Sequence, residues 1–239
     1  MNKNLRSHPM KNPVILALDV DTRDQALRIA DQVGDIIGGI KVGPRLCLRY
    51  GLEFVQELSQ RAPIFMDNKH FDIPSTMEAA VRASFDAGAS LVTVHALSGA
   101  EALKRVAAVE AELNKQRPFK VLAVTILTSW DQNSLPSVMK PQSISQHVTE
   151  LASLVQNSGI NGVVCSPHEL DLLQNRGLYL VTPGIRFSMN DSGDQKRIMG
   201  PQEALEKGAS ALVVGRPILE AKDIKQAANQ FVMAMNEKE

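Results

Sequence analysis

Between residues 64 and 76 the chain reads Ile64-Phe65-Met66-Asp67-Asn68-Lys69-His70-Phe71-Asp72-Ile73-Pro74-Ser75-Thr76. The continuous apolar start of this stretch is typical of a parallel strand that is buried on both faces. Pro74 favours the start of a helix, because its fixed φ suits the first helical position. The stretch therefore predicts one strand, a charged turn and the helix that follows it.

The same unit recurs along the rest of the chain. Short runs rich in Val, Ile and Leu alternate with amphipathic segments of helical spacing. Together with Ile64–Lys69, the predicted strands are Val14–Asp19, Ile36–Val42, Leu91–His95, Val121–Leu127, Gly162–Cys165, Tyr179–Thr182 and Ala211–Val214. Eight strand–helix repeats predict an α/β fold, a single-domain (β/α)8 TIM barrel over residues 13–239. Residues 1–12 are expected to form a polar N-terminal tail. A doubly wound open sheet is the competing fold, but no G-x-G-x-x-G motif opens the first helix.

Local signals mark the ends of the expected helices. Ser or Thr followed three residues later by Gln or Glu is typical of a capping box, and it occurs at Thr22, Ser98, Ser143 and Ser166. Glycine ends helices by adopting a left-handed conformation at no steric cost. We expect such helix ends at Gly88, Gly159 and Gly208.

Composition excludes several classes of function. The 239 residues contain 26 Lys plus Arg and 26 Asp plus Glu, so the net charge is +0. A neutral chain without basic blocks is a poor nucleic-acid binder, since such binding requires phosphate neutralisation. No apolar run approaches the roughly 20 residues of a membrane span, and the polar N-terminus has no secretory h-region. Two cysteines fit neither a disulfide framework nor a metal motif. We expect a cytoplasmic protein.

Charged residues end several of the predicted strands. Asp19, Lys41, Asp67 and Lys69 all stand at carboxyl ends of strands, which a barrel gathers around one mouth. Strand alternation places Asp67 and Lys69 on the same face, and Asp72 follows in the loop. An alternating array of lysines and aspartates offers a proton donor held beside a fixed negative charge. A structural ion-pair network is the alternative interpretation.

A second group of residues is suited to binding a phosphate. Gly215 and Arg216 close the last strand, where glycine allows close approach of a ligand to the backbone. Arg186 and Gln195 come from a long connection over residues 184–200, and barrels often bind phosphate at this end. A second long connection covers residues 128–142. No grouping of His, Asp and Glu predicts a metal site, and no triad predicts a nucleophile.

Seven motifs, in order, resemble the orotidine 5′-phosphate decarboxylase family, in its compact bacterial type. They are Ala17-Leu18-Asp19, Lys41-Val42-Gly43, Asp67-x-Lys69-x-x-Asp72-Ile73-Pro74-x-Thr76, Leu127-Thr128-Ser129, Thr182-Pro183-Gly184-Ile185-Arg186, Asp194-Gln195-Lys196-Arg197 and Val213-Val214-Gly215-Arg216-Pro217. The resemblance runs from about Pro13 to the last helix. It implies conversion of orotidine 5′-monophosphate to UMP and CO2, the last step of de novo UMP synthesis, with no metal or organic cofactor.

The resemblance also implies a role for each matching residue. Lys69 is expected to donate the proton, and Asp67 to lie against the substrate carboxylate. Lys41 is expected to pair with Asp67 and contact the ribose. Thr76 is expected to bind the substrate as well. The other expected substrate contacts are Asp19 for the ribose, Thr128 and Ser129 for the pyrimidine, and Arg186, Gln195, Gly215 and Arg216 for the phosphate. Asp72 is expected to reach the neighbouring subunit's site, which makes the functional unit a homodimer.

The chain departs from the family pattern at a few positions. Ser75 stands where Asn is common, and so does Thr93. We expect Ser75 to alter a hydrogen bond near the dimer contact, and neither departure to touch a residue assigned to chemistry.

Three other functions fit parts of the pattern. A sugar-phosphate decarboxylase such as 3-keto-gulonate 6-phosphate decarboxylase shares the barrel and the D-x-K-x-x-D strand but uses magnesium. The Ile73-Pro74-x-Thr76 extension and the Thr128-Ser129 pair argue against it. A non-catalytic phosphate sensor would be expected to lose Lys69 or Asp67, and a scaffold protein would not need charged strand ends.

Overall fold

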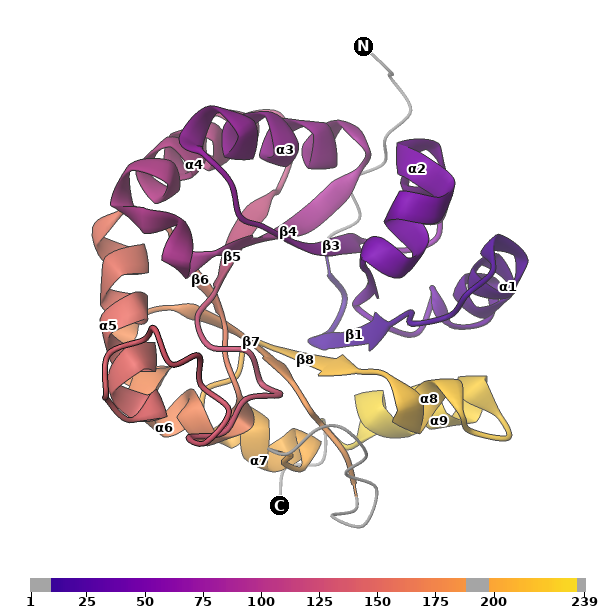
Figure 1. The fold of residues 1–239 in the computed structure, drawn as a ribbon. Helices are drawn as coiled ribbons and strands as arrows, with labels where there is room; N and C mark the ends of the chain where they lie inside the picture. Colours follow the sequence, from indigo (N-terminus) through magenta and orange to yellow (C-terminus); the bar gives the residue numbers. More distant parts are fainter. Residues whose placement is uncertain (1–9, 188–197, 236–239) are drawn as a thin grey trace.

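The structure, a computed structural model, describes residues 10–187 and 198–235. Eight parallel strands close into a barrel in sequence order, with the helices outside (Figure 1). The strands are β1 (Val14–Ala17), β2 (Gly39–Val42), β3 (Ile64–His70), β4 (Ala89–His95), β5 (Lys120–Val124), β6 (Gly162–Val164), β7 (Tyr179–Pro183) and β8 (Ala211–Val214). The predicted TIM barrel is confirmed.

The helices follow the strands as the sequence pattern predicts. They are α1 (Arg23–Val33), α2 (Pro44–Ser59), α3 (Pro74–Asp86), α4 (Gly99–Leu113), α5 (Ile144–Asn157), α6 (Leu170–Leu173), α7 (Pro201–Glu206), α8 (Arg216–Leu219) and α9 (Ile224–Met233). Three short 3₁₀ turns accompany them: η1 (Ala96–Ser98), η2 (Pro167–Glu169) and η3 (Gln174–Arg176). Helices α8 and α9 both follow β8 and cover the barrel beside α1 (Figure 1).

Most of the predicted helix boundaries are confirmed. Thr22 accepts a hydrogen bond from the backbone of Gln25, and complete capping boxes form at Ser143 and Ser166. Gly88, Gly159 and Gly208 adopt φ values of 93°, 91° and 94°.

The prediction at Ser98 is wrong. Ser98 already has helical backbone angles and its side chain makes no capping hydrogen bond. The short turn η1 precedes α4, and the cap there comes from His95, whose Nδ1 accepts a hydrogen bond from the backbone of Leu97 at 3.3 Å.

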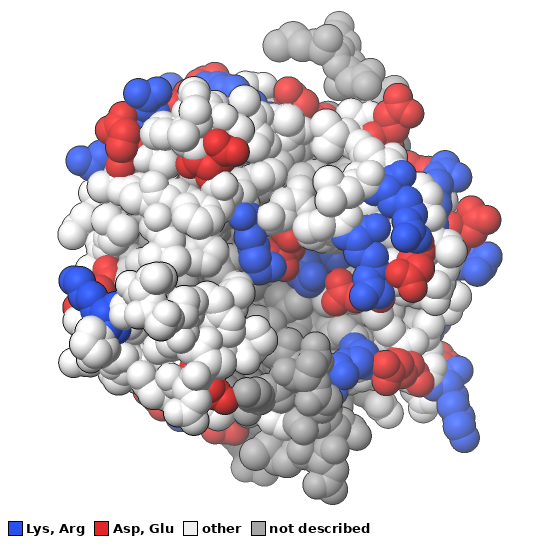
Figure 2. Space-filling view, viewed as in Figure 1, with Lys and Arg blue, Asp and Glu red and all other residues white. Residues whose placement is uncertain are grey.

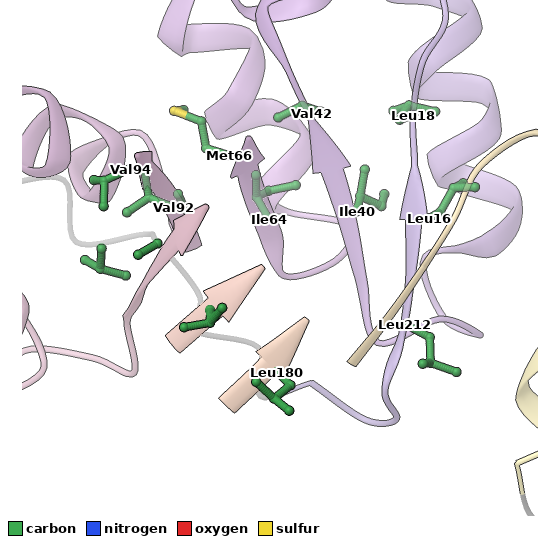
Figure 3. Packing of buried hydrophobic residues seen from close by; sticks show 14 of the residues in the cluster. Leu16, Leu18, Ile40, Val42, Ile64, Met66, Val92, Val94, Leu180 and Leu212 are labelled. Atoms are coloured by element: carbon green, nitrogen blue, oxygen red, sulfur yellow. The ribbon is translucent and has the colours of Figure 1, made fainter. Parts of the chain in front are cut away.

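Two layers of apolar side chains follow from the alternation along the strands. Leu16, Ile40 and Met66 belong to the outer layer, which packs between the strands and the helices (Figure 3). Ile15 and Phe65, one residue away, belong to the cluster inside the barrel. This alternation fixes which polar residues near the strand ends point inward.

The amino-terminal ends of the strands are closed by apolar and polar contacts. Met10 packs against the interior cluster, and Asn12 hydrogen-bonds the carbonyl of Ile36 at 2.7 Å. Residues 10–12 of the expected tail therefore contact the barrel. Among the described helices, none has both the length and the apolar character needed to cross a membrane.

Candidate active site

A cavity of about 460 Å³ opens at the carboxyl ends of the strands. Eight of the residues predicted from the sequence line it: Asp19, Lys41, Asp67, Lys69, Thr128, Arg186, Gly215 and Arg216. Figure 2 shows basic and acidic side chains gathered on the side of the molecule near β1, β2 and α2. The barrel therefore brings together charged groups that are up to 197 positions apart, Asp19 to Arg216, in the sequence.

Alternation along β2 and β3 directs two charged residues into the cavity. Ile40 and Val42 pack outward, so Lys41 points inward between them. Asp67 points inward because it follows Met66, which packs outward. A lysine and a carboxylate from adjacent strands are thereby placed side by side.

The charges form one connected array. Lys69 Nζ lies 2.9 Å from Asp67 Oδ1, and Lys41 Nζ lies 3.5 Å from Asp67 Oδ2. Lys41 Nζ also lies 3.4 Å from Asp19 Oδ1. Asp67 and Lys69, which strand alternation places on the same face, therefore contact each other directly. Asp67 is the central member, since it contacts both ammonium groups.

The pKa of Asp67 reflects opposing influences. Burial, the largest of them, favours the neutral acid, but the charges of Lys41 and Lys69 and hydrogen bonds from Lys69 and Thr93 together outweigh it. The net result is a pKa below the usual value of an aspartate. Asp67 is thus a fixed negative charge at neutral pH.

Two arginines, one after β7 and one after β8, also line the cavity. Arg186 follows β7, and its backbone N–H donates to the carbonyl of Met199 at 3.0 Å. A bridge between Ile185 and Met199 thereby joins the two ends of the 184–200 connection. Arg216 begins α8 directly after Gly215, where an added Cβ would lie 3.5 Å from the Cβ of Ala17.

Three of the predicted site residues do not line this cavity, although the structure describes them. Asp72 is exposed, and its Oδ1 accepts the neighbouring N–H of Ile73 at 2.7 Å. Thr76 and Ser129 are exposed and do not line the cavity either. Gln195 lies outside the described residues.

Several residues that shape the opening of the cavity were not predicted from the sequence. Asp21, Gln25 and Glu220 line the cavity. Two arginines one helical turn apart on α2 hold the turn after β1: Arg45 donates to the carbonyl of Asp19 at 3.3 Å, and Arg49 donates to that of Asp21 at 2.7 Å. The i, i+4 spacing of these arginines was the available signal, but it does not reveal a partner in another segment.

His147 is buried, and its Nε2 lies 3.1 Å from the carbonyl of Lys140. His95 packs against the ring of Phe71, with centroids 5.6 Å apart. Burial, and then the charge of Lys69, lower the pKa of His95. Within residues 10–187 and 198–235, no three His, Cys, Asp or Glu side chains gather as candidate metal ligands.

Comparison with known proteins identifies close relatives. The sequence profile described as "Orotidine 5'-phosphate decarboxylase / HUMPS family" matches residues 12–231. A protein from Actinobacillus pleuropneumoniae serotype 5b and one from Vibrio vulnificus, both named orotidine 5'-phosphate decarboxylase, are 39% and 40% identical to this chain. The alignments cover 90% of this chain in both cases, and 94% and 96% of those proteins.

Solved structures agree with the sequence relatives. The crystal structure of orotidine 5'-phosphate decarboxylase from Lactobacillus acidophilus superimposes with a TM-score of 0.83 at 34% identity, covering 95% of this chain and all of that one. A profile match over nearly the whole chain and relatives of about 40% identity establish the kinship. The chain belongs to the orotidine 5′-phosphate decarboxylase / HUMPS family.

Proposed function

We propose that this chain decarboxylates orotidine 5′-monophosphate to UMP and CO2, the last step of de novo UMP synthesis. The observation that carries this proposal is the array of Lys41, Asp67 and Lys69 on one side of a cavity that also holds Arg186 and Arg216. Such a cavity suits a substrate with a carboxylate at one end and a phosphate at the other. The names of the curated relatives support the same substrate.

The chemistry assigned to the array follows from where charge develops. Loss of CO2 leaves an electron pair on the ring carbon, and an ammonium group beside that carbon becomes more favourable as the charge grows. Lys69 then donates its proton to this carbon, which gives UMP. Asp67 disfavours the substrate carboxylate before the reaction and keeps Lys69 in place by the 2.9 Å contact.

The remaining residues bind the substrate at a distance from the reacting carbon. Lys41 and Asp19 contact the ribose, Thr128 the pyrimidine, and Arg186, Gly215 and Arg216 the phosphate. Ser129 and Gln195 are assigned to the pyrimidine and the phosphate by the family resemblance alone. Because the phosphate does not react, its binding energy can hold the charged array and the substrate together. Neither a metal nor an organic cofactor takes part in the proposed reaction.

The functional unit is proposed to be a homodimer in which Asp72 and Thr76 complete the partner subunit's site. Both residues lie outside the cavity of their own chain. The residues on either side of Asp72 are apolar and exposed: Phe71 is 62% exposed and Ile73 64%. A second copy of the chain would cover this apolar surface, whose exposure to water is unfavourable. We place the enzyme in the cytoplasm, where two free cysteines such as Cys47 and Cys165 stay reduced.

The test is an absorbance assay of orotidine 5′-monophosphate with purified protein in EDTA. We expect turnover by the wild type and a loss on the order of 10³-fold or more in Lys69→Ala, because the proton donor and the charge that stabilises the carbanion are both removed. Lys104→Ala is the matched control, since Lys104 is exposed on α4. It should keep wild-type activity.

The nearest rival is decarboxylation of a sugar phosphate with magnesium. A folded wild-type protein that leaves orotidine 5′-monophosphate unchanged but consumes 3-keto-gulonate 6-phosphate with added magnesium would replace our proposal with this one.

A further inference from the structure

The pairing of β3 with β4 is irregular at the charged array. Met66 pairs with Val92, and His70 pairs with Val94. Three residues of β3 between these pairs therefore stand opposite a single residue of β4, Thr93. An excess of residues in one strand bends it and re-aims its side chains. Two of these three β3 residues are Asp67 and Lys69.

The backbone of Lys69 shows the consequence of this irregularity. Lys69 has a φ of +49°, and it is the only residue other than glycine with positive φ in the part of the chain that the structure describes. A left-handed conformation in a side-chain-bearing residue costs about 1–3 kcal/mol and persists only where its surroundings impose it. The backbone N–H of Lys69 donates to Thr93 Oγ1 at 2.8 Å.

The same hydroxyl group also contacts the other charged residue. Thr93 Oγ1 donates to Asp67 Oδ1 at 3.0 Å, and Asp67 Oδ1 is the oxygen that Lys69 Nζ contacts at 2.9 Å. A hydroxyl has one donor and two acceptor lone pairs, so both bonds form at once. Thr93 is fully buried, and its β-branched side chain has few rotamers. The hydroxyl is therefore held in one place between the two residues.

We propose that Thr93 is a positioning residue that sets the relative placement of Lys69 and Asp67 through these two hydrogen bonds. Thr93 holds the strained backbone of Lys69 and the carboxylate of Asp67 in place. It does not itself line the cavity. The effect of Thr93 on catalysis rests on the function proposed above, whereas its effect on the placement of Lys69 and Asp67 does not. This finding corrects the expectation that the departure at Thr93 touches no residue assigned to chemistry.

Thr93→Val is the decisive variant, because valine keeps the shape of threonine and removes only the hydroxyl group. We expect kcat for orotidine 5′-monophosphate to fall about 10–100-fold, because a small misplacement of the reacting groups slows the reaction by this much. KM should change less than about threefold. Thr93→Ser retains the hydroxyl and should recover most of kcat. A merely structural role would lower stability without separating kcat from KM.

Thr125→Val is the matched control. Thr125 is as buried as Thr93 and stands at the end of the neighbouring strand β5, but its Oγ1 has no hydrogen-bond partner among the described residues. The same substitution there should leave kcat unchanged. If Thr93→Val does not fold, Thr93→Ala is compared with Thr93→Ser in the same assays.

A second readout does not depend on turnover. Crystal structures of wild type and Thr93→Val should show that Lys69 leaves the left-handed region and that the distance from its Nζ to Asp67 Oδ1 increases. An unchanged Lys69 together with wild-type kcat would overturn the proposal, as would a Thr93→Ser variant as slow as Thr93→Val. If wild type fails to decarboxylate orotidine 5′-monophosphate, the proposed function fails while the crystallographic comparison still decides the role of Thr93.

Discussion

Asp67 is the residue on which the charged array depends. Its carboxylate is mostly buried and lies between Lys41 and Lys69. Removing one member of a buried ion pair is costly, because its partners lose the charge that compensated their desolvation. Here both lysines keep some contact with water, so the cost is smaller than in a fully buried pair.

Asp67→Asn should therefore lower the free energy of unfolding at pH 7 by roughly 2–3 kcal/mol, measured by urea denaturation. The pKa of Asp67 is lower in the folded protein than in the unfolded chain, so its stabilisation is present above the unfolded pKa. It is lost as pH falls through the lower, folded value, and the difference between variant and wild type should shrink below about pH 3.9. Asp171→Asn, which breaks the exposed pair with Lys207, should cost less than about 1 kcal/mol. Equal stability of Asp67→Asn and wild type at pH 7 would contradict this account.

At the scale of strands and helices, local sequence patterns determine where most of these elements lie. Continuous apolar runs locate all eight strands, because a strand buried on both faces has no reason to alternate. Capping at Ser143 and the glycine at residue 159 likewise depend on neighbouring residues alone. The bulge in β3 could not be predicted this way, because it lies in the pairing of β3 with another strand, β4, where Lys69 contacts Thr93.

Gly162 in β6 shows how the packing of neighbouring strands restricts a residue. A Cβ at this position would lie 2.5 Å from the carbonyl oxygen of Val121 and 2.6 Å from Cδ2 of Leu122. Gly162→Ala should therefore destabilise the barrel by about 2 kcal/mol or more, through strain in a packed core. Thermal unfolding should show a Tm lower by about 4–8 °C in a chain of this size. Gly200→Ala, where an added Cβ meets no atom within 4 Å, should change Tm by less than about 2 °C. A Tm for Gly162→Ala as high as that of Gly200→Ala would show that β6 has room to shift.

At the scale of the whole molecule, the barrel explains why distant residues could be grouped from sequence. Parallel strands in a closed barrel present all their carboxyl ends at one mouth, so Asp19, Lys41 and Arg216 become neighbours once the fold is predicted. The same reasoning does not locate Asp72. This residue follows β3 but lies outside the cavity, and only its family resemblance assigns it to the site of a second chain.

Subunit mixing tests that assignment. If Asp72 acts in the partner's site, Lys69→Ala and Asp72→Asn homodimers each have two defective sites, but a mixed dimer has one site with both native residues. When the two variants are mixed in equal amounts and exchange subunits, half of the dimers are mixed, and each mixed dimer has one native site of two. The activity per total protein should therefore rise to about a quarter of the wild-type value. Native mass spectrometry confirms the exchange. Mixed dimers that form without any recovered turnover would show that each chain uses its own Asp72, or none. Lys104→Ala mixed with Lys69→Ala serves as the reference for subunits that do not need to complement one another.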